Sequence, residues 1–396
     1  MTESTETNDA IRSNLIVINK QKKILVATGL YPPDIGGPAT YSKLLKEELP
    51  KASKDKLRVI ILNFGEVRHW PLFLRHLIYF GKALYRGRFC DVIYAQDPVS
   101  VGLPALWAAK LLRKPFLLKI VGDYAWEQAV GRFGVTDHLD YFSTQSDIYG
   151  WYVRLLKTVQ TFVAKQAKQI IVPSRYLKKI VSNWGVDPAK IIVIYNAFDE
   201  PTNMPAKEAL RQKLDVTGEV IVSAGRLVPW KGFDTLVKIM PAVQAVYPKA
   251  KLLIIGAGPI KKNLAILIKR LGLLDSVLLT GQLEHQELLT YLRLADVFVL
   301  NTAYEGFSHL LLEVAAMGTP MITTRLGGNP EVIEDGKSGL LINYNDSEAW
   351  KSAILKVFAE PELAKKISLA AAIKIKNFST EKMINETIKL ILSCAS

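Results

Sequence analysis

The chain has 396 residues, of which 49% are hydrophobic and 22% charged, so it is long enough for two domains with a core each. Its only cysteines, Cys90 and Cys394, exclude a disulfide scaffold and a cysteine-rich metal site, and they fit a reducing compartment. No run reaches the ~18 apolar residues of a membrane-spanning helix. Residues 1–14 are polar, lack the basic start of a secretory signal and are expected to fray.

The formal net charge is +14 and is unevenly distributed. Residues 1–200 hold 28 Lys and Arg against 18 Asp and Glu, a surplus of 10, whereas residues 201–396 hold 23 against 19, a surplus of 4. A basic first half indicates an anionic partner: a membrane surface, a phosphorylated carrier or nucleic acid. Nucleic acid is the weakest of the three, because the sequence contains no helix-turn-helix, zinc-finger or RNA-binding signature.

Apolar runs of strand length alternate with helical patterns in the first half of the chain. The predicted strands are 23–29, 57–63, 91–95, 115–121, 169–174 and 190–196. The predicted helices are 39–49, 69–89, 101–112 and 148–168. Residues 199–205 are polar and contain two prolines, so we interpret them as a linker between two domains.

A glycine pair, Gly36 and Gly37, follows the first predicted strand, and Pro38 suits the first position of the next helix. Glycines before a helix let backbone amides approach a ligand. A tight turn between strand and helix would use the same residues, so both interpretations stay open.

Residues 69–89 form a predicted helix that is rich in aromatic and basic side chains and contains no acidic residue. A basic, aromatic amphipathic helix can lie in a membrane interface. The equally weighted alternative is a helix that packs on its own sheet and keeps its arginines in water.

The strand 115–121 is followed by Gly122 and Asp123. Open α/β sheets place their ligands at the carboxyl ends of parallel strands. Asp123 could therefore orient an acceptor hydroxyl or take its proton. The alternative is that Asp123 caps the segment that follows.

The second half repeats the alternation. Its predicted strands are 220–224, 251–256, 276–281, 296–300, 320–324 and 339–342. Its helices are 235–246, 285–294, 349–358, 361–375 and 381–392, with a short helix after the Gly327-Gly328 turn. The pattern predicts an α/β protein of two Rossmann-like, doubly wound parallel-sheet domains facing each other across a cleft. We expect one domain at 1–200, a second at 201–375 and a helix at 376–396 that crosses back to the first domain.

Arg226 and Lys231 lie in the connection between the strand 220–224 and its helix. An arginine fork with a lysine point charge can hold the two negative groups of a diphosphate. Cations in loops are usually solvated, but the flanking glycines and the strand end favour a site. Gly256 repeats the pattern of strand followed by glycine and could border a nucleobase, which is a weak signal.

Glu305 and Glu313 lie eight positions apart across a predicted loop and helix start, so both can face one cleft. The amides of Gly306, Phe307 and Ser308 would lie near the positive helix N-terminus, with Ser308 as the N-cap. Glu313 stands among apolar residues, where a carboxylate needs a partner or a ligand, although it could be an ordinary surface charge.

With these residues collected, the chain resembles the family 4 glycosyltransferases of the GT-B fold over roughly residues 22–392. The Glu305-to-Glu313 spacing carries most of the resemblance. Gly225-Arg226 with Lys231-Gly232, the Gly36-Gly37 loop and Gly327-Gly328 with Glu331 support it in the same order. The family implies transfer of a sugar from a nucleotide sugar with retention of configuration, without a cofactor and usually without a bound metal.

The resemblance also implies roles for the domains and for single residues. Residues 1–200 would bind the acceptor, and residues 201–375 would bind the nucleotide-sugar donor. Arg226 and Lys231 would neutralise the diphosphate, Glu313 would hold the ribose hydroxyls, and Glu305 would contact hydroxyls of the donor sugar. Gly36 and Gly37 would border the phosphates or the sugar. Preorganised cations help because charge builds up on the leaving diphosphate.

The chain departs from the family pattern at one position, in the part of the site where the acceptor would bind. Many family members have a His-Asp pair where this chain has Gly122-Asp123, and neither His138 nor His309 can be assigned to that role by spacing. What replaces the missing histidine is left open by the sequence.

We therefore expect a cytoplasmic glycosyltransferase, peripheral on the inner face of the membrane, with a UDP- or GDP-sugar donor. Its acceptor would be a glycan or lipid-linked precursor of cell-surface polysaccharide or glycolipid, and nucleic acid is not expected as a partner. The alternatives are another GT-B nucleotide-sugar enzyme, an epimerase or hydrolase, and a non-catalytic nucleotide-sugar-binding partner subunit.

Overall fold

The computed structural model describes residues 21–34, 36–145, 147–199, 201 and 203–395. The predicted fraying of residues 1–14 lies outside this part of the chain. The contacts divide the chain into two compact units. The first comprises residues up to Gln96, Ser100–Leu117 and the end of the chain from Thr387, and the second comprises Asp97–Val99 and Leu118–Glu386.

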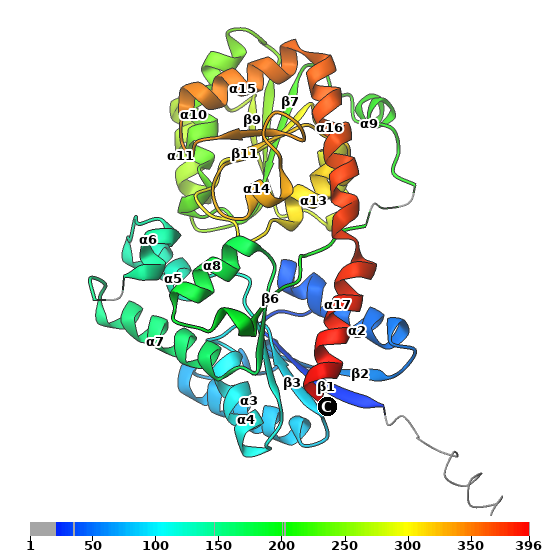
Figure 1. The fold of residues 1–396 in the computed structure, drawn as a ribbon. Helices are drawn as coiled ribbons and strands as arrows, with labels where there is room; N and C mark the ends of the chain where they lie inside the picture. The colour runs from blue at the N-terminus through cyan, green and yellow to red at the C-terminus, as the bar shows by residue number, and fades with distance from the viewer. Residues whose placement is uncertain (1–20, 35, 146, 200, 202, 396) are drawn as a thin grey trace, which may run out of the picture. The chain divides into compact units, whose positions relative to one another are not determined.

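The described residues form two six-stranded sheets in which the strand pairs are parallel (Figure 1). The first sheet has the order β2-β1-β3-β4-β5-β6 and the second has the order β12-β11-β10-β7-β8-β9. The strands of the first are β1 (Lys22–Thr28), β2 (Leu57–Asn63), β3 (Val92–Ala95), β4 (Phe116–Lys119), β5 (Gln169–Val172) and β6 (Ile191–Val193). Those of the second are β7 (Val220–Ala224), β8 (Lys251–Ile255), β9 (Val277–Gly281), β10 (Val297–Leu300), β11 (Met321–Thr324) and β12 (Leu340–Ile342).

Helices connect these strands. Up to β6 they are α2 (Gly37–Ala52), α3 (Leu72–Gly87), α4 (Gly102–Leu111), α5 (Tyr124–Phe133), α6 (Leu139–Thr144), α7 (Trp151–Gln166) and α8 (Arg175–Asn183). The later ones are α9 (Lys207–Lys213), α10 (Phe233–Gln244), α11 (Lys261–Arg270), α12 (His285–Leu294), α13 (His309–Ala316), α14 (Asn329–Val332), α15 (Ser347–Ala359), α16 (Pro361–Ile375) and α17 (Thr380–Ala395). Short 3-10 turns are η1 (Phe64–Val67), η2 (Pro188–Lys190), η3 (Pro229–Lys231) and η4 (Lys376–Phe378).

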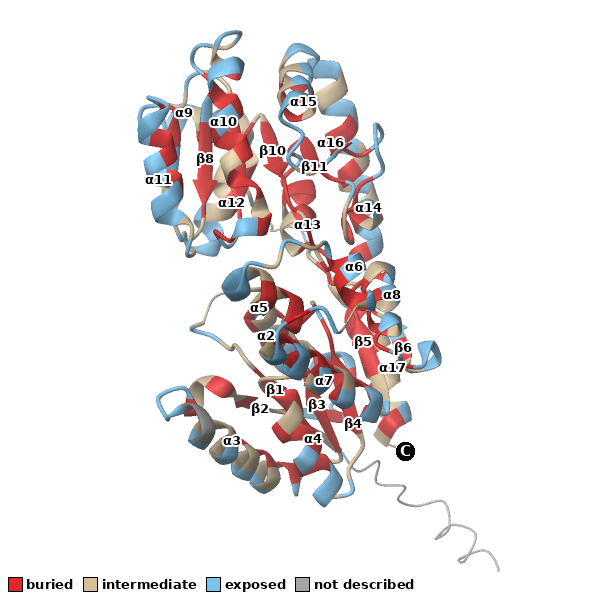
Figure 2. Ribbon diagram, turned by 90° about the vertical axis from the view of Figure 1, so that its left-hand side faces the viewer, coloured by how far each residue is buried: buried red, intermediate tan, exposed pale blue. Residues whose placement is uncertain are grey.

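The strands carry the cores, as Figure 2 shows by their colour. Residues Ile24 to Ala27 of β1 are fully buried, and every residue of β7 and β10 is buried. Parallel strands covered by helices on both faces bury all their side chains, which is why the sequence shows continuous apolar runs rather than alternation. In the second unit the two faces of the sheet have separate clusters, one around Phe298 and Leu312 and the other around Phe233 and Trp350.

All twelve predicted strands are confirmed, with ends that differ by at most three residues. The predicted helix 69–89 begins only at Leu72, because Pro71 takes the N-cap position. The described residues of the predicted linker 199–205 contain no helix or strand. The domain boundaries at 200 and 375 stay a prediction.

The strand order places the loops after β7 and β10 side by side. The chain runs from β7 to β8 and β9 on one side, whereas β10, β11 and β12 lie on the other side. The order therefore reverses between β7 and β10, and ligands of open α/β sheets bind at such a reversal, outside the carboxyl ends of the strands. The two loops at this point contain Lys231 and Glu305.

Candidate active site

Backbone and amide hydrogen bonds join the loop after β7 to the loop after β10. Asn301 directly follows β10, is fully buried, and donates from Nδ2 to the Gly232 carbonyl at 3.0 Å. The amide of Ala303 donates to the Trp230 carbonyl at 2.8 Å. These bonds hold the backbone on both sides of the site in one arrangement.

Lys231 and Glu305 form an ion pair at this point, with Lys231 Nζ donating to Glu305 Oε1. Their side chains are only 13% and 15% exposed. Charges that are this far removed from water attract each other more strongly than a surface pair does. The sequence predicted each residue for a donor site, and the structure shows that they contact each other directly.

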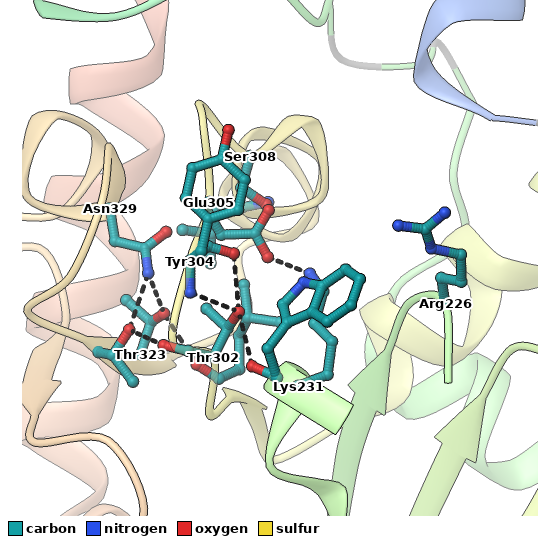
Figure 3. A network of polar contacts seen from close by, with 12 residues as sticks. Arg226, Lys231, Thr302, Tyr304, Glu305, Ser308, Thr323 and Asn329 are labelled. Carbon is teal, nitrogen blue, oxygen red and sulfur yellow. Dashed lines mark hydrogen bonds and ion pairs between the residues drawn. The ribbon is translucent and has the colours of Figure 1, made fainter. Parts of the chain in front are cut away.

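A polar network lies beneath the Glu305 loop (Figure 3). Thr302 Oγ1 donates to the Tyr304 carbonyl at 2.9 Å, and Thr324 Oγ1 donates to the Thr302 carbonyl at 2.7 Å. Asn329 Nδ2 reaches the hydroxyls of Thr323 and Thr324, both at 3.1 Å. These buried bonds fix the loop that presents Glu305.

The predicted Gly327-Gly328 turn packs directly on the Glu305 loop. The Gly328 amide donates to the Glu305 carbonyl at 2.8 Å. A Cβ on Gly327 would come within 2.3 Å of the Glu305 carbonyl oxygen, and one on Gly328 within 2.3 Å of the Gly306 carbonyl oxygen. Glycine is needed at both positions because the two backbones touch.

The segment after Glu305 opens α13 as predicted. Ser308 is its N-cap, and its Oγ accepts from the Leu311 amide at 3.4 Å. The Phe307 ring is buried between Tyr195 and Phe378, so only the Phe307 backbone remains for the predicted donor contact.

Glu313 is half-buried on α13 and has a partner that the sequence did not indicate. Its Oε1 lies 3.2 Å from His285 Nε2. The hydrogen bond to Glu313 raises the pKa of His285, which favours a protonated ring and an ion pair. Glu305 and Glu313 therefore have different partners in this structure.

Arg226 is exposed and lies apart from the Lys231–Glu305 pair (Figure 3). Its Nη2 donates to Glu127 Oε2 at 2.8 Å, and its guanidinium stands 5.4 Å from the Trp230 ring centroid. The predicted pair of cations is thus divided between two carboxylate partners, Glu127 for Arg226 and Glu305 for Lys231.

Gly256 packs closely on the loop that follows β7. A Cβ at this position would come within 2.0 Å of the Gly225 carbonyl oxygen.

Asp123 is fully buried and caps α5, which was the alternative interpretation of this residue. Its Oδ1 accepts from the Trp126 amide at 2.9 Å and from Gln160 Nε2 at 3.0 Å. Its Oδ2 is buried and has no hydrogen-bond partner in the described part of the chain. Burial raises the pKa of Asp123.

Gly36 and Gly37 belong to the first unit, where they stand at the start of α2. Gly36 is the N-cap with φ of 140°, a value that side-chain-bearing residues rarely adopt. The turn and the ligand interpretations both remain compatible with this geometry.

No role was predicted from the sequence for two carboxylates near the site, Glu331 and Glu127, although Glu331 is among the residues that carry the resemblance. Glu331 accepts from the amides of Arg175 and Tyr176 at the start of α8 and from the Tyr195 hydroxyl. Glu127 follows Asp123 by one helical turn, a spacing that places both on one face and could have drawn attention to it. The described residues contain no cluster of His, Cys, Asp and Glu that could hold a metal ion.

Two family models match the chain one after the other. The model of the glycosyl transferase 4-like domain matches residues 25–197, and the model of glycosyl transferases group 1 matches residues 206–374. The chain belongs to the family 4 glycosyltransferases. This confirms the resemblance that the sequence analysis stated.

Among curated proteins, this chain is similar to members of the family that are named for different substrates. It is 27% identical over 240 residues to the GDP-mannose-dependent alpha-(1-6)-phosphatidylinositol monomannoside mannosyltransferase of Mycolicibacterium smegmatis. The aligned residues are 58% of this chain and 63% of the relative. The chain is 28% identical over 205 residues to the D-inositol 3-phosphate glycosyltransferase of Segniliparus rotundus, 50% of this chain and 46% of the relative. The similarity thus spans less than two thirds of the length of these relatives.

Solved structures confirm the predicted GT-B fold class. Sucrose-phosphate synthase from Thermosynechococcus elongatus matches with a TM-score of 0.77 and 20% identity, over 95% of this chain and 100% of that one. Anabaena HepE in complex with UDP-glucose matches with a TM-score of 0.73 and 20% identity, over 94% and 99% of the two chains. At this level of identity the likeness establishes the fold alone.

Proposed function

We propose that the protein is a retaining, metal-independent glycosyltransferase. It transfers a sugar from a nucleotide-diphosphate sugar to a glycan or lipid-linked acceptor in the synthesis of cell-surface polysaccharide or glycolipid. The observation that carries this proposal is the Lys231–Glu305 pair, which lies at the strand-order reversal where doubly wound sheets bind ligands.

The chemistry follows from the charges at this point. As the bond from the sugar C1 to the diphosphate oxygen breaks, negative charge develops on the diphosphate, and Lys231 and Arg226 stabilise it. Glu305, released from Lys231 by the diphosphate, accepts hydrogen bonds from hydroxyls of the donor sugar. The acceptor oxygen bonds to C1 on the face that the leaving group vacates, and its proton passes to the leaving phosphate, so configuration is retained.

The relatives support a UDP- or GDP-sugar donor and a lipid-linked acceptor. The mannosyltransferase relative is named as GDP-mannose-dependent and as acting on a phosphatidylinositol mannoside, and the HepE structure holds UDP-glucose. A further relative, LpsE of Rhizobium meliloti, is named for lipopolysaccharide core biosynthesis and is 30% identical over 186 residues, 46% of this chain and 53% of the relative.

An exposed apolar and basic surface on α3 and α4 supports the proposal of peripheral attachment at the cytoplasmic face of the membrane. The two helices pack side by side (Figure 1). Glu66 binds Lys82 and Arg86, so these two cations serve the fold. What we call the α3–α4 surface consists of exposed apolar and basic residues on or beside both helices: Leu74, Leu77, Tyr85, Arg88, Phe89, Trp107, Lys110 and Leu111.

Such a surface fits an anionic bilayer because aromatic rings enter the interface while cations meet the headgroups. Arg88 lies 4.3 Å from the Tyr85 ring centroid and 4.4 Å from that of Phe89, so charge and rings are grouped. The other face of α3 packs inward through the buried Tyr79 and Ala83. Within the described residues, no helix combines the length and the hydrophobicity that crossing a bilayer requires.

The direct test is a thermal-shift screen against UDP-, GDP- and ADP-sugars in the presence of EDTA, followed by transfer assays with the donor that binds. A ligand that binds the folded protein raises its melting temperature by mass action. We expect one donor class to stabilise the protein and proton NMR to show a product with the anomeric configuration of the donor.

Other outcomes would contradict parts of the proposal. Turnover of the nucleotide sugar without any acceptor would indicate an epimerase or hydrolase. Binding without turnover for any acceptor would indicate a non-catalytic partner subunit. Loss of activity in EDTA that added Mg²⁺ restores would exclude metal independence.

A further inference from the structure

Two side-chain oxygen atoms lie close to Gly122, the residue before the buried Asp123. A Cβ on Gly122 would lie 3.0 Å from Glu127 Oε1 and 3.0 Å from Tyr304 Oη. A larger residue at position 122 would therefore displace one or both of these groups. The absence of a side chain leaves the space above Gly122 to the carboxylate and the phenol.

The Tyr304 hydroxyl is held in place but lacks a hydrogen bond. Tyr304 is buried, and its Oη has no hydrogen-bond partner in the part of the chain that the structure describes. Burial, followed by the negative charge of Glu127, raises its pKa well above the usual value, so the group stays protonated and can donate. The Trp126 ring packs edge-on against Tyr304 at 5.2 Å and limits its movement.

The two carboxylate oxygens of Glu127 have different neighbours. Oε2 accepts from Arg226 Nη2 at 2.8 Å, whereas Oε1 is the oxygen that faces the space above Gly122. The side chain is 30% exposed, so a ligand can reach it. Arg226 is the residue assigned above to the diphosphate, which means that donor binding draws the guanidinium away from Glu127.

A sugar hydroxyl donates one hydrogen bond and accepts others. Tyr304 provides a donor, and Glu127 provides an acceptor at the same small space. We propose that Glu127 and Tyr304 form a subsite for one sugar hydroxyl above Gly122, and that the Arg226–Glu127 ion pair opens when the diphosphate binds. This inference rests on the proposed function and identifies a specificity-determining contact within that site.

The test compares Glu127→Gln and Tyr304→Phe with the wild type, and Glu208→Gln on an exposed face of α9 serves as the control. Four quantities are measured: the affinities for the nucleoside diphosphate and for the nucleotide sugar, the KM for the acceptor, and kcat. Both variants are expected to lower kcat/KM about tenfold or more, because each removes a hydrogen bond to the sugar. Affinity for the nucleoside diphosphate alone is expected to stay within about twofold in Tyr304→Phe. In Glu127→Gln it is expected to stay within about twofold or to rise, because Arg226 loses a competing negative charge.

The same four measurements show whether the hydroxyl belongs to the donor sugar or to the acceptor. Weaker binding of the nucleotide sugar, with unchanged binding of the diphosphate, assigns it to the donor sugar. A higher KM for the acceptor alone assigns it to the acceptor. Tyr304→Phe is further expected to raise the melting temperature while it lowers activity, because it removes a buried hydroxyl without a partner.

Two results overturn the subsite while leaving the proposed function intact. One is a wild type that binds and transfers, with both variants within about twofold of its kcat/KM. The other is a Glu127→Gln variant that weakens binding of the diphosphate and of the nucleotide sugar equally, since Glu127 then only positions Arg226. If the wild type binds no nucleotide sugar, the proposed function fails and the subsite fails with it.

Discussion

The Lys231–Glu305 ion pair brings two residues of the proposed donor site into direct contact. Lys231 lies at the end of η3 and Glu305 in the loop after β10, and each neutralises the other at a half-buried position. Removing a carboxylate from its partner costs free energy unless another anion takes its place. In the function proposed above, a diphosphate supplies that anion for Lys231, and hydroxyls of the donor sugar satisfy Glu305.

The sequence predicted a set of candidate site residues but not which of them touch. Lys231, Glu305 and Asp123 were selected because they follow strands, and strand ends are readable from apolar runs. Pairing depends on how loops of different strands meet. For that reason the Arg226–Glu127 and His285–Glu313 contacts, which join residues 99 and 28 positions apart, left no signal in the sequence.

The His285–Glu313 contact leads to a pH prediction. Glu313 raises the pKa of His285 above its value of 6.5 in the unfolded chain. The stabilisation is therefore fully present below pH 6.5 and is lost as the pH rises through the folded pKa. We expect His285→Gln to destabilise the protein at about pH 5.5 and to be nearly neutral at about pH 9 in urea unfolding. An equal loss of stability at both pH values would show that His285 is not protonated in its contact with Glu313.

At the scale of elements, the strands were predictable and several helices were not. A parallel strand covered on both faces has a continuous apolar run, which is visible without any knowledge of its neighbours. Helices α5, α8 and α11 were not predicted, although α5 and α8 have N-caps, Asp123 and Ser174, that the sequence contains. A cap residue alone is common in turns, and it identifies a helix only when a helical pattern follows.

The contact between the Gly327-Gly328 turn and the Glu305 loop gives an element-scale prediction. Gly328→Ala would place a Cβ 2.3 Å from the Gly306 carbonyl oxygen, so one of the two backbones must move. We expect a loss of about 1–3 kcal/mol in the free energy of unfolding, as for other overpacked sites, together with weaker donor binding.

The control for this substitution is Gly81→Ala in α3, where an added Cβ meets no atom within 4 Å. In a helix interior this change is expected to stabilise the protein by up to about 1 kcal/mol. Urea unfolding and donor titration of both variants make the comparison. Equal stability of the two variants would show that the turn does not pack on the Glu305 loop as described.

At the level of the whole molecule, two of the basic residues behind the charge asymmetry, Arg88 and Lys110, lie on the α3–α4 surface. The first half holds a surplus of 10 positive charges, and the α3–α4 surface lies within it. The composition predicts that the partner is negatively charged, and this inference needs no knowledge of the fold because a sum of charges does not depend on it. The composition could not separate Arg88, which lies over exposed rings, from Arg86, which binds Glu66.

The membrane prediction is tested by flotation with vesicles, with and without anionic lipid. We expect the wild type to float with anionic vesicles and the Leu77→Glu/Tyr85→Glu double variant to lose about tenfold in binding, because charge enters the apolar part of the interface. Leu274→Glu is the matched control, since Leu274 and Leu77 are both 64% exposed. Flotation that is independent of anionic lipid, or equal for the variant and the control, would contradict a role of the α3–α4 surface.

The proposed function requires Lys231 to bind the diphosphate of a nucleotide sugar. Calorimetric titration of the stabilising donor into the wild type, Lys231→Ala and the control Lys238→Ala, whose lysine is exposed on α10, tests it most directly. We predict that Lys231→Ala weakens donor affinity by about 1.5–3 kcal/mol, roughly 10- to 150-fold, while the folded state persists and Lys238→Ala matches the wild type. Unchanged donor affinity in a folded Lys231→Ala variant would show that Lys231 does not bind the diphosphate.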